Sequence, residues 1–441
     1  MKKTNKFISL VTLGWALLLI GIAIAEPKNG SSTSLGRLST GSFTGNRIHD
    51  DLENNGMIVS HRLTGHSGME WPAGEHKYSN FASGVWFAGK VNDAIRTAVG
   101  EFGPEFSSGP WGADADGDDK LYIVNKSDMA DPLASDDFQN WPADLGAPWV
   151  DNDGDGEYTP LPNGTDHPEF IGDQVIWYVM NDGVSSTHTI FATDPLGIEV
   201  RVTIWGYDRP DSFGDMMFVK AQAYNKGGNA IKDMYIGLWD DPDLGNAGDD
   251  FVGCDTTLSL GYCYNDGADN DYGSAAPALG YDFFQAAVPG ASTDTTFAFG
   301  EIKAGFQKLE MSSFTKYING DPVYTDPNDA SEMYNYMSGK LKNGLPFVNS
   351  ASGLESKFVH ACDPNGNVDG NDDCWVDSDD HASGDRRFLM NVGPFDFAAG
   401  DSAELVFGIM HAQGADPLNS ITLLKQVDGL AQLAYDIQFA L

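Results

Sequence analysis

The sequence predicts a mainly β protein, an antiparallel β-sandwich with long acidic loops and one C-terminal helix. Glycine is abundant, at 51 of 441 residues, which favours loop-rich β structure over helices. Apolar and polar residues alternate along several segments after residue 172, as they do in strands with one buried face. The chain is 41% hydrophobic, so it can bury the core that two packed sheets require.

The charge of the chain is strongly acidic. Asp and Glu number 64 against 26 Lys and Arg, for a formal net charge of −38. This balance argues against nucleic acid and anionic membrane surfaces as partners, because both are recognised through basic patches. An acidic composition often marks disorder, but 10 Trp, 25 Phe and 16 Tyr residues argue for a folded core. The charge favours a soluble protein outside the cell that gathers divalent cations.

Residues 1–25 have the pattern of a signal peptide. Three lysines precede an apolar stretch that ends in Ala-Ile-Ala before Glu26, which is a small-residue cleavage site. We expect cleavage there, with an uncleaved anchor as the alternative. No later segment is apolar enough to span a bilayer. The mature protein is therefore expected to be secreted and to have no membrane span.

Residues 26–165 are predicted to form a loop-rich N-terminal β region. Its short strands are expected within 43–62, 84–96 and 120–125. Asn-Asn-Gly interrupts the first of these segments, and Asn92-Asp93 interrupts the second. Both sequences favour hairpin turns.

Residues 166–441 are predicted to form the sandwich domain. The clearest alternation places Ile198, Val200, Val202 and Ile204 on one side of a strand. Turn residues separate the apolar segments, as in antiparallel sheets. The strands are expected at 173–180, 197–207, 215–225, 231–239, 258–264, 297–306, 387–392 and 403–411.

A helix is expected at about residues 416–438. Asp416 is a suitable N-cap, and Pro417 suits the first helical position. Apolar residues then recur every three to four positions, so one face of the helix can pack against the sandwich. A shorter helix is expected within 331–345.

The four cysteines are an even number, which suits an oxidising compartment. Cys362 and Cys374 bracket a turn-rich loop, and we expect them to form a disulfide. Cys254 and Cys263 would lie ~30 Å apart on an extended chain, beyond disulfide reach. A hairpin that joined them would turn near Ser259, where the residues are poor turn formers. Their pairing is left open.

The most specific motif is DNDGDGEY at 151–158. Acidic side chains at loop positions 1, 3 and 5, with Gly at 6, match the first half of an EF-hand-type calcium loop. The Glu expected at position 12 is replaced by Pro162, and Asp166 or Glu169 can supply a ligand from further on. We predict a structural calcium site here, with a simple turn as the alternative. The predicted ligands are Asp151, Asp153, Asp155, Glu157 and Asp166.

The stretch 239–265 carries the densest cluster of aspartates. Carboxylates this close repel one another unless a cation lies among them, and oxygen ligands on a flexible loop suit calcium. The alternative is a solvated acidic loop. We predict metal ligands among Asp240, Asp241, Asp243, Asp249, Asp250 and Asp255. A third candidate lies inside the expected disulfide loop and consists of Asp363, Asn365, Asn367 and Asp369. A shorter acidic run stands at 114–119.

Signatures of catalysis are lacking in the sequence. It contains no H-E-x-x-H, G-x-S-x-G, Walker or C-x-x-C motif, and its nine histidines show no metal-ligand spacing. Carboxylate pairs at glycosidase distance arise by chance among 64 acids. We therefore predict no catalytic residue and do not favour an enzyme.

Tryptophans in loops suggest a carbohydrate-binding alternative, because exposed aromatic rings stack on sugars. Those in loops are Trp71, Trp111, Trp141, Trp149 and Trp375. They can equally act as hydrophobic plugs beneath the loops. Trp86, Trp177 and Trp239 lie within apolar strands and are expected in the core.

Five segments together resemble a family of large secreted proteins of the Bacteroidota and related Gram-negative phyla, which are mostly exported by type IX secretion. The segments are 69–91, 172–182, 195–207, 239–265 and 385–410. The resemblance implies a shared fold and an extracellular or cell-surface location in a Gram-negative bacterium, but no reaction. Members commonly continue into fibronectin-like modules and a sorting domain, whereas this sequence stops after the expected helix, so surface attachment is left open.

Two functions are compatible with these features. The first is a calcium-stabilised extracellular β protein with a structural, adhesive or binding role. The alternative is a carbohydrate-binding or polysaccharide-processing protein that uses loop aromatics and paired carboxylates. Extracellular glycans or surface proteins are the expected partners, and the oligomeric state is open.

Overall fold

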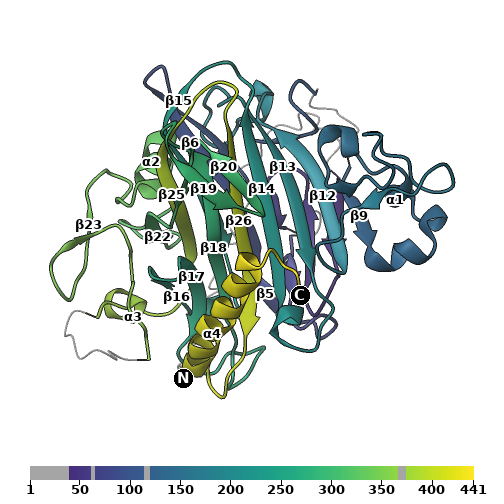
Figure 1. The fold of residues 1–441 in the computed structure, drawn as a ribbon. Helices are drawn as coiled ribbons and strands as arrows, with labels where there is room; N and C mark the ends of the chain where they lie inside the picture. The colour runs from purple at the N-terminus through teal and green to yellow at the C-terminus, as the bar shows by residue number, and fades with distance from the viewer. Residues whose placement is uncertain (1–38, 61–64, 114–119, 366–373) are drawn as a thin grey trace, which may run out of the picture. The chain divides into compact units, whose positions relative to one another are not determined.

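Two antiparallel sheets form the centre of the protein in a computed structural model, which describes residues 39–60, 65–113, 120–365 and 374–441 (Figure 1). The predicted mainly β class, with antiparallel sheets and a C-terminal helix, is confirmed. The expected signal peptide at residues 1–25 and the acidic run at 114–119 lie outside the described residues. Among the helices that are described, none combines the length and the apolar character that a membrane span requires.

The larger sheet has the strand order β16-β17-β18-β26-β14-β13-β12-β8, and β21 and β9 add to β18 and β12. Its strands are β8 (Ser107–Ser108), β9 (Tyr122–Asn125), β12 (Gln174–Asn181), β13 (Ile198–Gly206), β14 (Met216–Asn225), β16 (Asp250–Asp255), β17 (Leu260–Asn265), β18 (Ala278–Pro289), β21 (Phe306–Leu309) and β26 (Ser402–Ala412).

The smaller sheet has the order β22-β25-β15-β6-β3, with β7 paired to β6. Its strands are β3 (Met57–Val59), β6 (Ala82–Val91), β7 (Ala94–Val99), β15 (Ile231–Asp241), β22 (Ser313–Tyr317) and β25 (Arg387–Phe397). The expected turn at Asn92-Asp93 joins β6 to β7, and both residues have positive φ (50° and 65°), as a type I′ hairpin turn requires.

Short strands and helices surround the two sheets. A four-stranded sheet contains β1 (Thr40–Phe43), β2 (His49–Glu53), β4 (Met69–Glu70) and β5 (Tyr78–Asn80). The two-stranded ladders are β10 (Trp149–Val150) with β11 (His167–Pro168), β19 (Thr295–Ala298) with β20 (Glu301–Ala304), and β23 (Phe347–Val348) with β24 (Glu355–Ser356). The helices are α1 (Asp136–Gln139), α2 (Ala330–Met337), α3 (Asp377–Asp380) and α4 (Pro417–Asp436).

Hydrophobic cores lie on both faces of the larger sheet. Between the sheets, Tyr281 of β18 and Phe388 of β25 meet with ring centroids 5.8 Å apart. On the opposite face, Trp177 and Trp205 share a second core with Leu424 of α4. Strand β12 is buried along its whole length because it contributes alternate residues to both cores. Its sequence is therefore continuously apolar instead of alternating.

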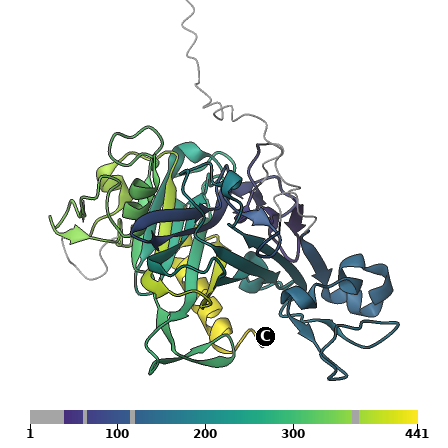
Figure 2. The same ribbon diagram turned by 90° about the horizontal axis from the view of Figure 1, so that it is seen from above.

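Helix α4 covers the outer face of the larger sheet across β17, β18 and β26 (Figure 1). The side chain of Asp416 accepts a hydrogen bond from the amide of Asn419, and Pro417 opens the helix, as expected. Helix α2 contacts the smaller sheet instead. The connector that contains α1 and the segment that contains α2, α3 and β23 lie at opposite sides of the sheets in Figure 1 and in Figure 2.

Strands from the expected N-terminal region complete both sheets. In the smaller sheet β6 pairs with β15, and in the larger sheet β8 and β9 pair with β12. The described residues belong to one compact unit. Residues 39–165 and 166–441 therefore share their cores instead of folding around separate ones.

Candidate functional site

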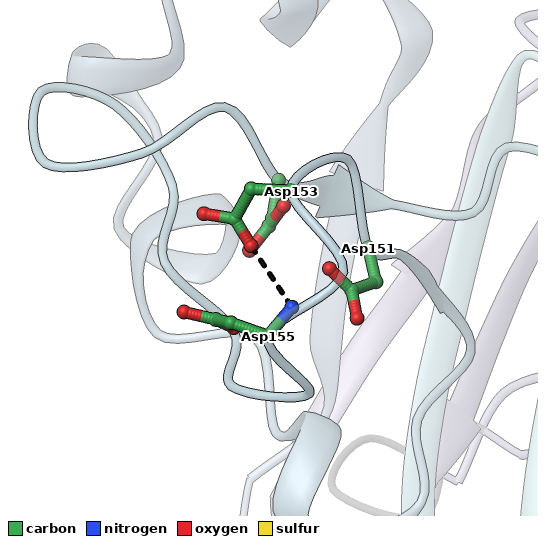
Figure 3. A group of neighbouring side chains, drawn as sticks. Asp151, Asp153 and Asp155 are labelled. Atoms are coloured by element: carbon green, nitrogen blue, oxygen red, sulfur yellow. Dashed lines mark hydrogen bonds between the residues drawn. The ribbon is translucent and has the colours of Figure 1, made fainter.

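Four aspartates meet in and beside the loop that follows β10. One carboxylate oxygen from each of Asp151, Asp153, Asp155 and Asp166 lies within 4.8 Å of the others. Figure 3 shows the side chains of the first three gathered around one space. Two oxygens that lie 2.3–2.6 Å from one hard cation are at most about 5 Å apart. This cluster, here called the loop site, can therefore hold a metal ion.

A short β-ladder explains why Asp166 reaches the loop site. Val150 of β10 pairs with His167 of β11. Asp151, which follows β10, and Asp166, which precedes β11, are thus brought side by side. Asp166 is buried, whereas Asp151, Asp153 and Asp155 are exposed.

Backbone amides hold the loop-site carboxylates in place. Asp151 accepts hydrogen bonds from the amides of Gly154 and Gly156, at 2.6 and 3.0 Å. Asp166 accepts from the amides of Asn152 (2.8 Å) and Thr159 (2.9 Å). The bonds from Thr159 and Asn152 lower the pKa of Asp166. This carboxylate is therefore held in the charged form that binds metal.

Glu157 is placed differently from the other predicted ligands of this loop. Its amide donates to Asp155 at 2.8 Å, but its side chain is exposed and does not belong to the four-carboxylate cluster.

A second acidic cluster lies at the end of the smaller sheet. Oxygens of Asp241, Asp243 and Asp385 lie within 4.8 Å of one another. Asp241 ends β15, and Asp385 precedes β25, which is the neighbouring strand. We call this cluster the sheet site. Strand pairing brings Asp385 to it. This residue was not predicted as a ligand, because its position beside Asp241 depends on which strands pair.

The sheet site contains buried oxygens that lack hydrogen-bond partners. Asp241 is 3% exposed, and its Oδ1 has no partner among the described residues. The same holds for Oδ1 of Asp385. The other oxygen of Asp241 lies 3.0 Å from Nε of Arg387. Buried polar atoms are normally paired, so these oxygens are free to accept a hydrogen bond or to bind a cation.

The charges at the sheet site do not balance. Arg387 is the nearby cation, but it also bonds Asp326 through Nη1 at 2.7 Å. Burial raises the pKa of Asp241 well above its usual range, and burial together with Asp385 raises the pKa of Asp243 to about 6. Carboxylates whose charge is disfavoured in this way either bind protons or bind a cation.

Four other predicted ligands lie outside the sheet site. Asp240 points to the opposite face of β15, where it accepts from Asn80 Nδ2 at 2.7 Å, because side chains alternate along a strand. Asp250 is buried and accepts from the amide of Leu244 at 3.0 Å. Asp249 accepts a hydrogen bond from Asn265 Nδ2 at 3.1 Å. Asp255 lies 3.1 Å from Nζ of Lys425.

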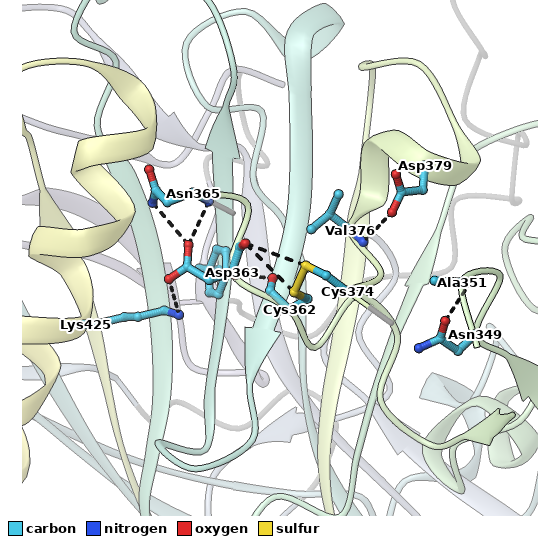
Figure 4. Close-up of a disulfide and its surroundings, with 10 residues drawn as sticks. Asn349, Ala351, Cys362, Asp363, Asn365, Cys374, Val376, Asp379 and Lys425 are labelled. Carbon is cyan, nitrogen blue, oxygen red and sulfur yellow. Dashed lines mark hydrogen bonds and ion pairs between the residues drawn. A yellow bond between two sulfur atoms is a disulfide. The ribbon is translucent and has the colours of Figure 1, made fainter. Parts of the chain in front are cut away.

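Within the third predicted cluster, Asp363 pairs with a lysine. Lys425 of α4 reaches Asp363 at 2.9 Å (Figure 4). It also lies 3.1 Å from Asp255. Asp363 also accepts from the amide of Asn365 at 2.9 Å. Asn367 and Asp369 lie outside the described residues. Of this predicted cluster, Asp363 is thus paired with a protein ammonium, and the metal site itself stays a prediction.

The cysteines adopt two different states. Cys362 and Cys374 form the expected bridge, with Cα atoms 5.3 Å apart (Figure 4). Cys254 and Cys263 are free and buried. They lie on the paired strands β16 and β17, opposite Gly261 and Val252. A hairpin does join them, and its turn includes Ser259 at a φ of 56°, but the register keeps the two thiols unpaired.

Most of the loop tryptophans have buried side chains. Trp71, Trp141 and Trp375 are at most 5% exposed. The indole N–H of Trp71 donates to Asp215, and that of Trp375 donates to Asp380. Trp111 is 37% exposed. Trp71, Trp141, Trp149 and Trp375 each pack against a tyrosine or histidine ring.

No known family model matches the chain, and a search of curated proteins finds no significant match.

Proposed function

We propose that the protein is a secreted, calcium-stabilised β-sandwich with a structural, adhesive or binding role at or outside the cell surface. The observation that carries this proposal is the buried and unpartnered Oδ1 of Asp241 beside Asp243 and Asp385. A buried acceptor oxygen that is left without a partner costs about 1–3 kcal/mol. A bound cation would offset this cost.

Calcium is favoured over other metals by the chemistry of the two clusters. Every side-chain ligand is a carboxylate, with no His or Cys among them. Calcium takes six to eight oxygens, which loop carbonyls and water can complete, whereas magnesium demands a stricter octahedron. The loop site supplies three such carboxylates on a glycine-containing turn and a fourth, from Asp166, beside it.

Export is the second component of the proposed function. The signal-like residues 1–25 and the resemblance to proteins exported by type IX secretion support it. N-terminal sequencing of protein recovered from the culture medium should then begin at Glu26. Retention of the first 25 residues, or of the protein inside the cell, would contradict this component.

Calcium binding is tested by calorimetric titration and thermal unfolding of the full mature chain. We expect two bound ions, each of which stabilises the folded protein by about 2.7 kcal/mol at a free calcium concentration of about 100 times its Kd. Asp153→Asn should remove the loop-site ion, and Asp243→Asn the sheet-site ion, because each loses a carboxylate ligand.

The matched control is Asp255→Asn, since Asp255 pairs with Lys425 and belongs to neither cluster. Both ions should still bind this variant. If EGTA leaves the melting temperature of the wild-type protein unchanged and the titration shows no heat, the calcium proposal fails at both sites.

A further inference from the structure

A cavity of about 170 Å³ lies on the outer face of the smaller sheet. Its walls include Trp86 of β6, Trp239 of β15, and Phe102 and Phe191 from loops. The two indole rings are nearly parallel, at 8°, with centroids 6.1 Å apart. Phe102 stands perpendicular to Trp239 at 5.2 Å and is 48% exposed, so it lies where the cavity meets solvent.

Strand register places the two tryptophans on one face. Trp86 is opposite Gly237, and Trp239 is opposite Gly84. Because residues two apart share a face, all four residues lie on the same side of the sheet. Each indole therefore lies opposite a glycine instead of a second large side chain. The missing side chains leave space beside the two rings.

Several polar groups of the cavity wall lack partners. The hydroxyl of Tyr317 is buried without a hydrogen bond, and Tyr317 is 1% exposed. Across the described chain, no residue hydrogen-bonds the Glu101 carboxyl or the Trp239 indole N–H. Tyr317 pairs in register with Arg387, which also lines the cavity. A ligand with hydroxyl groups would satisfy these donors and acceptors.

The charges of the wall nearly cancel. Arg387 bonds Asp326 at 2.7 Å, and both line the cavity. Burial, followed by the proximity of Asp326, raises the pKa of Glu101 to about 8, so this carboxyl is mostly neutral at pH 7. A cationic ligand would need an aromatic cage without a competing guanidinium, and an anion would meet Asp326. The wall therefore favours a neutral polar ligand.

The cavity has room for one ring of a ligand. A cavity of about 150 Å³ holds benzene, so one six-membered ring fits here. We propose that this cavity binds a single neutral sugar ring, whose C–H face packs on the indoles while its hydroxyls bond Glu101, Arg387 and Tyr317. Aromatic faces are negative and attract C–H groups. The inference deepens the proposed binding role and does not require an ion at either acidic cluster.

The test uses saturation-transfer NMR and tryptophan fluorescence on the full mature chain. The probes are glucose, galactose, mannose, xylose and N-acetylglucosamine, with tetramethylammonium as the cationic comparison. We expect at least one neutral sugar to saturate below about 50 mM. Each titration is run in calcium and in EGTA, so that failure of the calcium proposal and failure of the sugar site give different results.

Two variants locate the site. Phe102→Ala and Glu101→Ala should each weaken sugar binding at least about tenfold. Phe102 and Glu101 are both partly exposed, and circular dichroism verifies folding. Phe297→Ala is the matched control, because Phe297 is 51% exposed on β19 and does not line the cavity. The sugar affinity of this variant should equal that of the wild type.

Three results would overturn the inference. They are the absence of sugar binding in both calcium and EGTA, tighter binding of tetramethylammonium than of every sugar, and unchanged sugar affinity in both the Phe102→Ala and Glu101→Ala proteins.

Discussion

Asp240 and Asp241 are adjacent in the sequence and face opposite sides of β15. Asp240 lies in the core, where it accepts from Asn80 and where burial raises its pKa to about 8. Asp241 faces outward to Arg387, Asp243 and Asp385. The density of aspartates in this stretch thus mixes two kinds of residue. One contributes to a buried hydrogen-bond network, and the other to a candidate metal site.

The buried position of the two free cysteines determines their reactivity. Cys254 and Cys263 are at most 1% exposed, and burial raises the pKa of both thiols well above their usual value. Reactivity toward disulfide reagents requires both access and the thiolate form. These two thiols are therefore expected to be inert in the native protein.

Titration with Ellman's reagent tests this expectation. The native protein should release no thionitrobenzoate, and the protein in guanidinium chloride should show two thiols, because Cys362 and Cys374 remain bonded. Prior reduction should raise the count to four. Rapid labelling of native protein would contradict the buried positions of Cys254 and Cys263.

Pairing of elements assembles both acidic clusters. The β10–β11 ladder brings Asp166 to the calcium-loop motif, and the neighbouring strands β15 and β25 bring Asp385 to Asp241. The helix α4 contributes differently, since its Lys425 neutralises Asp255 and Asp363. These partly exposed ion pairs are each expected to stabilise the protein by roughly 1 kcal/mol.

Helix α4 also buries a carboxyl pair against the sheet. Asp428 is 1% exposed, and Asp282 of β18 is fully buried. Burial raises the pKa of Asp428 to about 7, and burial together with Asp428 raises the pKa of Asp282 well above its usual value. Between about pH 4 and pH 7 the folded protein therefore holds protons that the unfolded chain has released.

Stability should fall across this range as the pH rises, because the native state binds more protons than the unfolded state. The slope is at most about 1.4 kcal/mol per pH unit for each proton held. Asp428→Asn should flatten the slope, since one titrating group is removed. The measurement is the free energy of urea unfolding in EDTA from about pH 4.5 to about pH 7.5, the interval that these raised values span.

The control for this prediction is Asp436→Asn, on the exposed end of the same helix. Its pH slope should match that of the wild type. An Asp428→Asn protein with an unchanged slope would show that the pair does not titrate in this range.

The net charge of −38 acts on the whole molecule. Like charges across the surface repel one another and destabilise the compact state. The Debye length shortens from about 30 Å at 0.01 M salt to about 8 Å at 0.15 M. Sodium chloride over this range should therefore raise the melting temperature, even in EGTA.

Differential scanning calorimetry at the two salt concentrations measures this effect. Calcium added at matched ionic strength should give a further increase, because site binding is distinct from screening. A melting temperature that falls with salt would show that specific ion pairs outweigh the general repulsion.

Local patterns in the sequence determined the β class, the capped helix α4, the disulfide between Cys362 and Cys374, and the carboxylates at 151–155 as metal candidates. Each depends on periodicity, capping or turn chemistry within a few residues. Strands β6 and β7 with their Asn-Asp turn are predictable for the same reason.

Tertiary structure alone decided which distant residues meet. It joined Asp385 to Asp241, separated Asp240 from both, and gave Asp255 a lysine partner. It also turned Trp86 and Trp239, correctly expected to be buried, into the wall of a cavity. The physical reason is that strand order and register are set by packing across the whole sandwich, which no short segment encodes.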